Sequence, residues 1–369
     1  MVNTTLVSCS NFASRTDFSS YVADVRRVTD NNISLISDCQ TEVCNALWGS
    51  GNPDISGIGM ILGYVLENAL GFFFASALSI VPRSAPRGGK AERLIPHVER
   101  VRDVLMQGCS SYYDSAIFLC FSVQIASIVM LSRLDFGISA SGMGDSTAKI
   151  TWAVSLLTLL PLLYVAYLPH LLQGPVSDQQ AARQDSKRKL RFGLFSMCWL
   201  LTLYPFYSKM IGYFGPSLIG DGEGQAISDD DWNIIQAVCT ANVEAISDRE
   251  LVAMQFFGVA GSLFVSICTL FKVIWLGLHR QHRDSRFVQK IQKYRVSIGP
   301  KLTMIFLMLL PLLAISQIWT ILRLRQFQQG ISRNTGNENF DSQWTFGQIA
   351  SITVFAPVAV ECAFGWVNG

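Results

Sequence analysis

The sequence predicts an all-α fold, a polytopic membrane helix bundle of about seven transmembrane helices. The 369-residue chain is 50% hydrophobic and only 15% charged, whereas soluble domains are typically near 25% charged. Apolar stretches close to the ~20 residues that a bilayer requires alternate with short charged loops. We place the spans, with six or eight as the margin of error, at 57–81, 113–132, 148–172, 191–214, 251–278, 300–322 and 345–366.

Positive charge is concentrated in three loops, and this sets the expected orientation. Lys and Arg residues cluster after the first, third and fifth spans, over 83–102, 183–191 and 280–301. The loop 215–250 holds Arg249 as its only basic residue, among many acids. Because cytoplasmic loops are enriched in Lys and Arg, we expect the three basic loops on the cytoplasmic side. The N-terminus is then lumenal or outside the cell, and the C-terminus is cytoplasmic.

This topology divides the chain into two parts. Residues 1–56 form a lumenal N-terminal segment, and residues 57–369 form the transmembrane domain with a lumenal loop at 215–250. The N-terminal segment lacks the charged start and apolar core of a cleavable signal peptide, so we expect the first span to direct insertion. We predict a multi-pass protein of the endoplasmic reticulum or another endomembrane, glycosylated at the sequons that begin at Asn3 and Asn32.

The nine cysteines fall into two groups. Four of them lie on the expected oxidising side, at Cys9, Cys39, Cys44 and Cys239. An even number in that compartment is compatible with two disulfides, and four cysteines allow three pairings. The others lie in spans or at their cytoplasmic edges and are expected to be buried thiols: Cys109, Cys120, Cys198, Cys268 and Cys362.

The first span carries an acid near its middle, in the stretch NPDISGIGMILGYVLENALGFFFASALSIVPR. An ionised carboxylate at that depth costs at least a few kcal/mol and marks a function or a specific partner. Gly59, Gly63, Glu67, Gly71 and Ala75 recur every four residues and therefore share one helix face. Small residues at this spacing let a neighbouring helix come close. We therefore expect Glu67 to point into the protein and not into lipid.

Glu67 has two interpretations that the sequence leaves open. It is either a functional acid or a carboxyl that joins two helices by hydrogen bonds, for example through Asn68 or Gln124. Glu361, in the inner half of the last span, has the same two interpretations. Asp114 lies near the cytoplasmic mouth of the second span, and a place so near the end favours an ordinary charged residue.

Pro357, four residues before Glu361, predicts a kink in the last span. A proline there leaves the Thr353 carbonyl without its helical donor. A kink beside an intramembrane acid suits a cavity.

Metal and cofactor motifs are not found. The acidic stretch SDDDW (Ser228 to Trp232) has no second acidic cluster at supporting spacing, and His279 and His282 have no cysteine or carboxylate array beside them. Walker, dinucleotide-binding, GxSxG and HExxH motifs are also missing. We therefore expect no cofactor and no metal. The net charge of +2, with basic residues placed by topology, gives no indication of a nucleic-acid partner.

The stretch CNALWGSGNPDISGIGM (Cys44 to Met60), with the chain length and the pattern of spans, resembles a group of fungal multi-pass membrane proteins. The resemblance is to the membrane-bound terpene cyclases of the ascofuranone pathway type, which serve meroterpenoid biosynthesis, a branch of secondary metabolism. It implies an isomerase that cyclises an epoxidised prenyl chain on an aromatic polyketide, with no diphosphate lost. Consistently, SDDDW fits neither the DDxxD nor the DxDD pattern. No catalytic residue of the family can be carried over by motif.

The candidate catalytic residues therefore come from the buried acids, which are Glu67, Glu361 and Asp114. Epoxide opening needs a proton delivered to the oxygen, and a carboxyl in a low-dielectric site stays protonated near neutral pH, as a general acid must. A second carboxylate or a water then removes the surplus proton. The expected partners are a lipophilic prenylated small molecule and membrane lipid.

Two other classes of function compete with the enzyme. Seven spans with an outer N-terminus is receptor topology, although LPHLLQ (Leu168 to Gln173) has no E/DRY triplet and APVAVECAFG (Ala356 to Gly365) has no NPxxY. A proton-coupled transporter would also use a buried glutamate, but no inverted repeat is apparent in the sequence.

Overall fold

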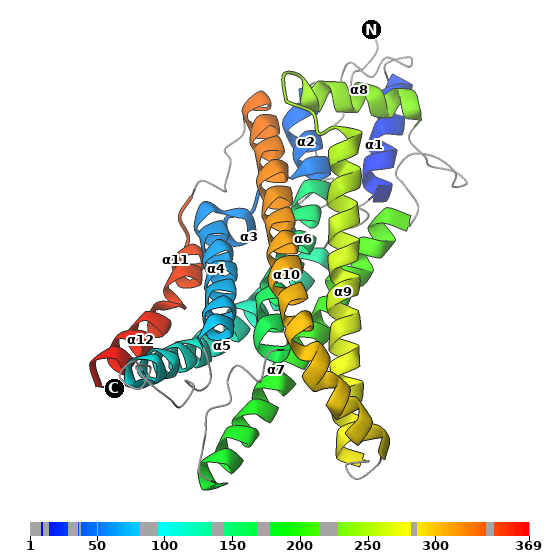
Figure 1. Ribbon diagram of the computed structural model, residues 1–369. Helices are drawn as coiled ribbons and strands as arrows, with labels where there is room; N and C mark the ends of the chain where they lie inside the picture. Colours follow the sequence, from blue (N-terminus) through cyan, green and yellow to red (C-terminus); the bar gives the residue numbers. More distant parts are fainter. Residues whose placement is uncertain are drawn as a thin grey trace.

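Helices make up the fold (Figure 1). The computed structural model describes residues 9, 15–28, 36, 38–49, 51–81, 95–133, 144–167, 178–214, 228–281, 286–336 and 343–368. Within these ranges no strand is formed, which confirms the all-α prediction for this part of the chain. The helices are α1 (Arg15–Val28), α2 (Gln40–Trp48), α3 (Pro53–Ser56), α4 (Ile58–Ile80), α5 (Ile95–Leu131), α6 (Asp145–Tyr167), α7 (Asp178–Phe214), α8 (Asp229–Thr240), α9 (Asp248–Gln281), α10 (Arg286–Asn334), α11 (Phe346–Thr353) and α12 (Ala356–Asn368).

Six stretches of the described chain are helical, long enough and apolar enough to cross a membrane. They are Pro53–Ile80, His97–Leu131, Asp145–Tyr164, Asp248–Ile274, Met304–Asn334 and Phe346–Val367. These stretches agree with a multi-pass helical membrane protein. The seventh expected span, 191–214, coincides with the second half of α7, which is not one of the six.

The second and last spans differ from their predicted form. Helix α5 begins at Ile95, far before the expected start at 113, because hydropathy detects only the apolar part of a helix that continues through the polar sequence before it. The last span is two helices, since α11 ends at Thr353 and α12 begins at Ala356.

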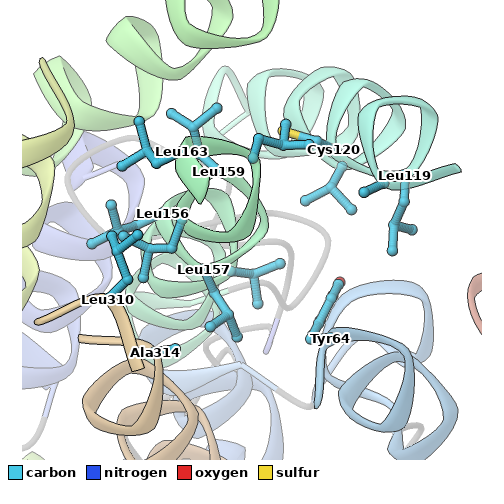
Figure 2. Packing of buried hydrophobic residues seen from close by; sticks show 14 of the residues in the cluster. Tyr64, Leu119, Cys120, Leu156, Leu157, Leu159, Leu163, Leu310 and Ala314 are labelled. Atoms are coloured by element: carbon cyan, nitrogen blue, oxygen red, sulfur yellow. The ribbon is translucent and has the colours of Figure 1, made fainter. Parts of the chain in front are cut away.

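Helix α6 forms the centre of the bundle, with α4, α5, α7, α9 and α10 packed around it. Every side chain described from Ile150 to Tyr164 is buried. A helix that is apolar all round is stable only inside a protein or a membrane, and here it is enclosed by its neighbours. Figure 2 shows its leucines between α10 on one side and α4 and α5 on the other; the labelled residues are Leu156, Leu157, Leu159, Leu163, Leu310, Ala314, Tyr64, Leu119 and Cys120.

A cap made of α1, α2 and α8 lies at one end of the bundle, beside the end of α10 (Figure 1). The cap has its own apolar cluster, in which Phe18, Val25, Val43, Ile235 and Ile331 are fully buried. Disulfides Cys9–Cys39 and Cys44–Cys239 fasten it, and the second joins α2 to α8 across 195 residues. The expected two disulfides are therefore present, with one of the three possible pairings.

The acidic stretch before Trp232 starts α8 of this cap. The Ser228 hydroxyl accepts a hydrogen bond from the backbone N–H of Asp231, as an N-cap residue does. The buried Asp231 carboxylate forms an ion pair with Arg26 of α1. This carboxylate therefore joins two cap helices. The two predicted glycosylation sites, Asn3 and Asn32, lie outside the described residues.

Peptide mapping without reduction tests the disulfides of the cap. We expect Cys9 linked to Cys39 and Cys44 linked to Cys239, with Cys109, Cys120 and Cys198 recovered as free thiols. The paired variant Cys44→Ser with Cys239→Ser should lose about 2–5 kcal/mol of stability, because the lost cross-link closes a long loop. Recovery of a Cys39–Cys44 peptide, or of four free cap thiols, would contradict the pairing.

Candidate functional site

The glycine face of α4 is buried along its whole length, as the spacing of its residues predicts. Gly59, Gly63, Glu67, Gly71 and Ala75 are all buried, and Glu67 has no exposed surface. Residues on other faces of the helix, such as Leu62 and Phe73, are exposed. The acid of the first span therefore points into the protein.

The first half of this face contacts α11. A Cβ atom at position 63 would lie 2.7 Å from the Ser351 Oγ, so only glycine permits this approach. The Gly59 N–H donates to Gln348 Oε1 at 2.9 Å, and the Ser351 hydroxyl donates to the Gly59 carbonyl at 3.1 Å. The first and last spans are thus neighbours at this level of the bundle.

The second half of the face contacts α5 and α6. A Cβ atom at position 71 would lie 2.6 Å from the Tyr112 Oη and 3.0 Å from the Pro161 Cβ. The Tyr112 hydroxyl donates to the backbone carbonyl of Glu67 at 3.0 Å. Glu67 therefore lies where α4, α5 and α6 meet.

The Glu67 carboxyl has no hydrogen-bond partner among the described residues: both oxygens are buried and neither is paired. The two partners that the sequence suggested are engaged elsewhere. Asn68 Nδ2 donates to the carbonyls of Tyr64 and Leu157, at 2.9 and 3.4 Å. Gln124 Nε2 donates to the Ser155 carbonyl at 2.8 Å, and its Oε1 accepts from the Ser155 hydroxyl at 2.5 Å. The Glu67 carboxyl therefore does not join two helices through Asn68 or Gln124.

For an unpaired carboxyl in such surroundings, the neutral form costs less free energy than the ionised form. A lone ionised group in such surroundings costs several kcal/mol, whereas an unpaired neutral polar group costs about 1–3 kcal/mol. Buried unpaired polar groups are rare in native structures and call for an explanation, and a catalytic role is one of the established ones. Glu67 is therefore the first candidate for chemistry.

The other two predicted acids line one groove between α5 and the α11–α12 pair. The groove has a volume of about 530 Å³ and is lined by Gln107, Ser110, Ser111, Asp114, Ser115, Phe118, Val354, Pro357 and Glu361. This size lies in the range of about 300–1,000 Å³ that small-molecule sites occupy. Glu67 is not part of the lining.

The break at Val354 and Phe355 shapes the groove. Helix α11 ends before these residues, and Pro357 occupies the first turn of α12, where proline is tolerated because that N–H has no helical acceptor. The kink predicted from Pro357 is therefore present. Val354 and Pro357 both line the groove, so the break forms part of its wall.

The two groove acids have different partners. Gln107 Nε2 donates to Glu361 Oε2 at 2.7 Å. Arg191 of α7 donates to both oxygens of Asp114, at 2.8 and 2.7 Å, and to the Ser110 hydroxyl at 2.7 Å. Such a bidentate pair fixes the position of the Asp114 side chain. It joins α5 to α7, in agreement with the structural interpretation of this residue.

A chain of contacts runs from the edge of the groove to Glu67 through two aromatic residues. Phe355 follows the groove residue Val354, and its ring stacks on Tyr112 with centroids 6.1 Å apart. The Tyr112 hydroxyl bonds the Glu67 carbonyl on the far side. Within the described chain, no hydrogen bond joins Glu67 to Glu361.

Sequence reasoning missed the polar stripe of α5. Three polar residues of this stripe line the groove at three- and four-residue spacing: Gln107, Ser111 and Asp114. The apolar Phe118 follows at the same spacing. The signal was present, but a span that starts at 113 excludes its first half. No metal site accompanies these residues: the described side chains contain no group of three or more His, Cys, Asp or Glu that could hold an ion.

Comparisons with known proteins give no match. No protein-family model matches the chain, and no curated protein or solved structure is significantly similar to it.

Proposed function

We propose that this chain is a membrane-bound terpene cyclase that opens an epoxidised prenyl chain by acid catalysis and closes it into a ring. The observation that carries the proposal is the Glu67 carboxyl, which is fully buried within a membrane-spanning helix and has no partner on either oxygen among the described residues. Such a group is a proton donor kept away from water. The choice of an epoxidised prenyl chain as the substrate comes from the resemblance of the stretch Cys44 to Met60 to fungal meroterpenoid cyclases.

The proposed reaction is an isomerisation. The Glu67 carboxyl gives its proton to the epoxide oxygen as the C–O bond breaks, and the oxygen becomes a hydroxyl. Positive charge develops on the more substituted carbon, where an alkene or hydroxyl of the substrate forms the new bond. A base, either a second carboxylate or a water, removes the surplus proton, so that the substrate gains and loses no atom. The enzyme is restored when a proton passes from this base back to the Glu67 carboxylate.

Aromatic side chains near Glu67 support a cationic intermediate. Tyr64 and Tyr112 are fully buried within electrostatic range of its carboxyl. The ring of Phe74 lies 5.7 Å from that of Tyr112. Ring faces attract a cation most strongly where water is excluded, and a dry site also delays quenching of the cation by water. A prenylated phenol partitions into the bilayer and would reach such a site from lipid.

The proposal includes a location and an orientation. We place the cap on the lumenal side of an endomembrane, as a glycoprotein, because disulfides persist in oxidising compartments and the basic loops lie on the other side of the alternating spans. Figure 1 shows the cap at one end of the bundle and the end of α12 at the other. Opposite sides for the two termini require an odd number of crossings, and α7 supplies the seventh at 191–214.

Reporter fusions test this topology. Fusions after Arg191 and after Lys301 should report a cytoplasmic position, and a fusion within 221–231 should report a lumenal one. If the acidic loop 215–250 proved cytoplasmic, the orientation would be reversed. Equal signals from both sides of α7 would remove the seventh crossing.

Replacement of Glu67 by Gln tests the catalytic role. Gln keeps the size and the capacity for hydrogen bonding but has no titratable proton, so turnover of an epoxidised prenyl phenol should fall by ~10²–10⁴-fold. The metabolite profile of a strain that carries the variant should show the epoxide in place of the ring. Protein level in the membrane should stay unchanged, because the neutral acid and the amide are close in volume.

The matched control is Glu42→Gln, the same change at an exposed residue of the cap, which should turn over at the normal rate. Normal turnover by Glu67→Gln, at normal protein level, would exclude Glu67 as the proton donor.

A further inference from the structure

The groove between α5 and α12 places polar groups on a surface that faces lipid. Phe118 of its lining is exposed, as are Ile125 on α5 and Val360 and Phe364 on α12. Both helices belong to stretches that are apolar enough to cross a membrane. Polar and charged groups at such a surface are costly unless they meet a partner. A ligand with polar atoms could therefore meet those groups of the groove that lack a protein partner.

The groove offers an open carboxylate oxygen beside serine hydroxyls, which can both donate and accept. The guanidinium at its edge, Arg191, is committed to Asp114 and Ser110. Glu361 Oε2 accepts from Gln107, while Oε1 receives no hydrogen bond from the described residues. A carboxylate oxygen only accepts, so it calls for a ligand group that donates. A hydroxyl, a phenol or an ammonium group has this chemistry.

We propose that this groove binds the phenolic end of an amphiphile that enters from the bilayer, with its hydroxyl donating to Glu361. The inference rests on the proposed function for the choice of a prenylated phenol. The volume of about 530 Å³ suits one substituted ring, and Phe118, Val354 and Pro357 supply the apolar contact that an aromatic ring requires.

The groove also lies where such a ligand could present its chain to Glu67. The ring of Phe355, in the α11–α12 break, stacks on Tyr112, whose hydroxyl donates to the Glu67 backbone carbonyl. Phe355 is in the break itself, where its N–H makes a long 3.4 Å bond to the Ile352 carbonyl. A rotation of the Phe355 side chain would open this route without breaking a backbone hydrogen bond. The phenol then stays in the groove while the prenyl chain passes inward.

Photolabelling of the purified protein in phosphatidylcholine nanodiscs tests the inference. Three diazirine probes share one prenyl chain and differ in the end group, which is a phenol, an ammonium or a methyl. We expect the phenol probe to label 107–118 and 354–361 roughly 10-fold more than the methyl probe, the value of one hydrogen bond to a charged group. The variant Gln107→Leu with Glu361→Leu should lose this preference, and the lipid-facing control Ile125→Leu should keep it.

The outcomes separate the explanations. Equal labelling by all three probes, or a preference that survives the double variant, would overturn the inference. Stronger labelling by the ammonium probe would assign the groove to an amine-bearing lipid and would also overturn it. If the double variant failed to fold, the single variant Glu361→Gln would be measured instead. This change replaces one of the two carboxylate oxygens by an NH₂ donor and should still lower the preference for the phenol probe. An unchanged preference in this variant would overturn the inference.

Labelling is independent of turnover, so it is judged apart from the proposed function. A labelled groove together with normal turnover by Glu67→Gln would overturn the catalytic role alone. An unlabelled groove with turnover lost in Glu67→Gln would overturn the binding inference alone.

Discussion

The close approach of neighbouring helices to the glycine face of α4 is the contact on which the rest of the structure depends. Gly59 and Gly63 admit α11, and Gly71 admits Tyr112 of α5 and Pro161 of α6. Any side chain at these positions would push the helices apart, since a Cβ atom would come within 3 Å of its neighbours. The same approach removes Glu67 from both lipid and water. The same close packing of helices therefore also buries the Glu67 carboxyl, which has no partner among the described residues.

Two carboxyl groups, Glu67 and Glu361, have different proposed roles. Glu67 is dry, unpaired and suited to give a proton, whereas Glu361 is partly exposed, bonded to Gln107 and suited to hold a ligand. Asp114 belongs to neither role, because Arg191 holds it as an ion pair that ties α7 to the bundle. The break before Pro357 contributes Val354 to the groove and Phe355 to the contact with Tyr112. At the far end, the disulfide-bonded cap holds α2 and α8 against α10.

The features that depend on the spacing of residues could be predicted from the sequence. The features that depend on contacts between distant helices could not. The all-α class, the buried glycine face, the kink at Pro357 and the presence of two disulfides all follow from spacing and residue type. The start of α5 was missed because a polar helix beyond the apolar core has no hydropathy signal. The disulfide pairing and the groove were out of reach for another reason. Cys44 meets Cys239, and Gln107 meets Glu361, only when helices distant in the sequence pack together.

Infrared spectroscopy shows directly whether the Glu67 carboxyl is protonated, and it does so without substrate. A protonated carboxylic acid has a carbonyl stretch above the amide band, and an ionised carboxylate does not. We expect such a band for the wild-type protein in membranes at neutral pH. The band should shift slowly in heavy water, because the group is buried. It should be absent from the Glu67→Gln variant. The Glu361→Gln variant should retain it. A wild-type spectrum that lacks the band, or one from which Glu67→Gln removes nothing, would show that Glu67 is not a neutral acid and would contradict the account.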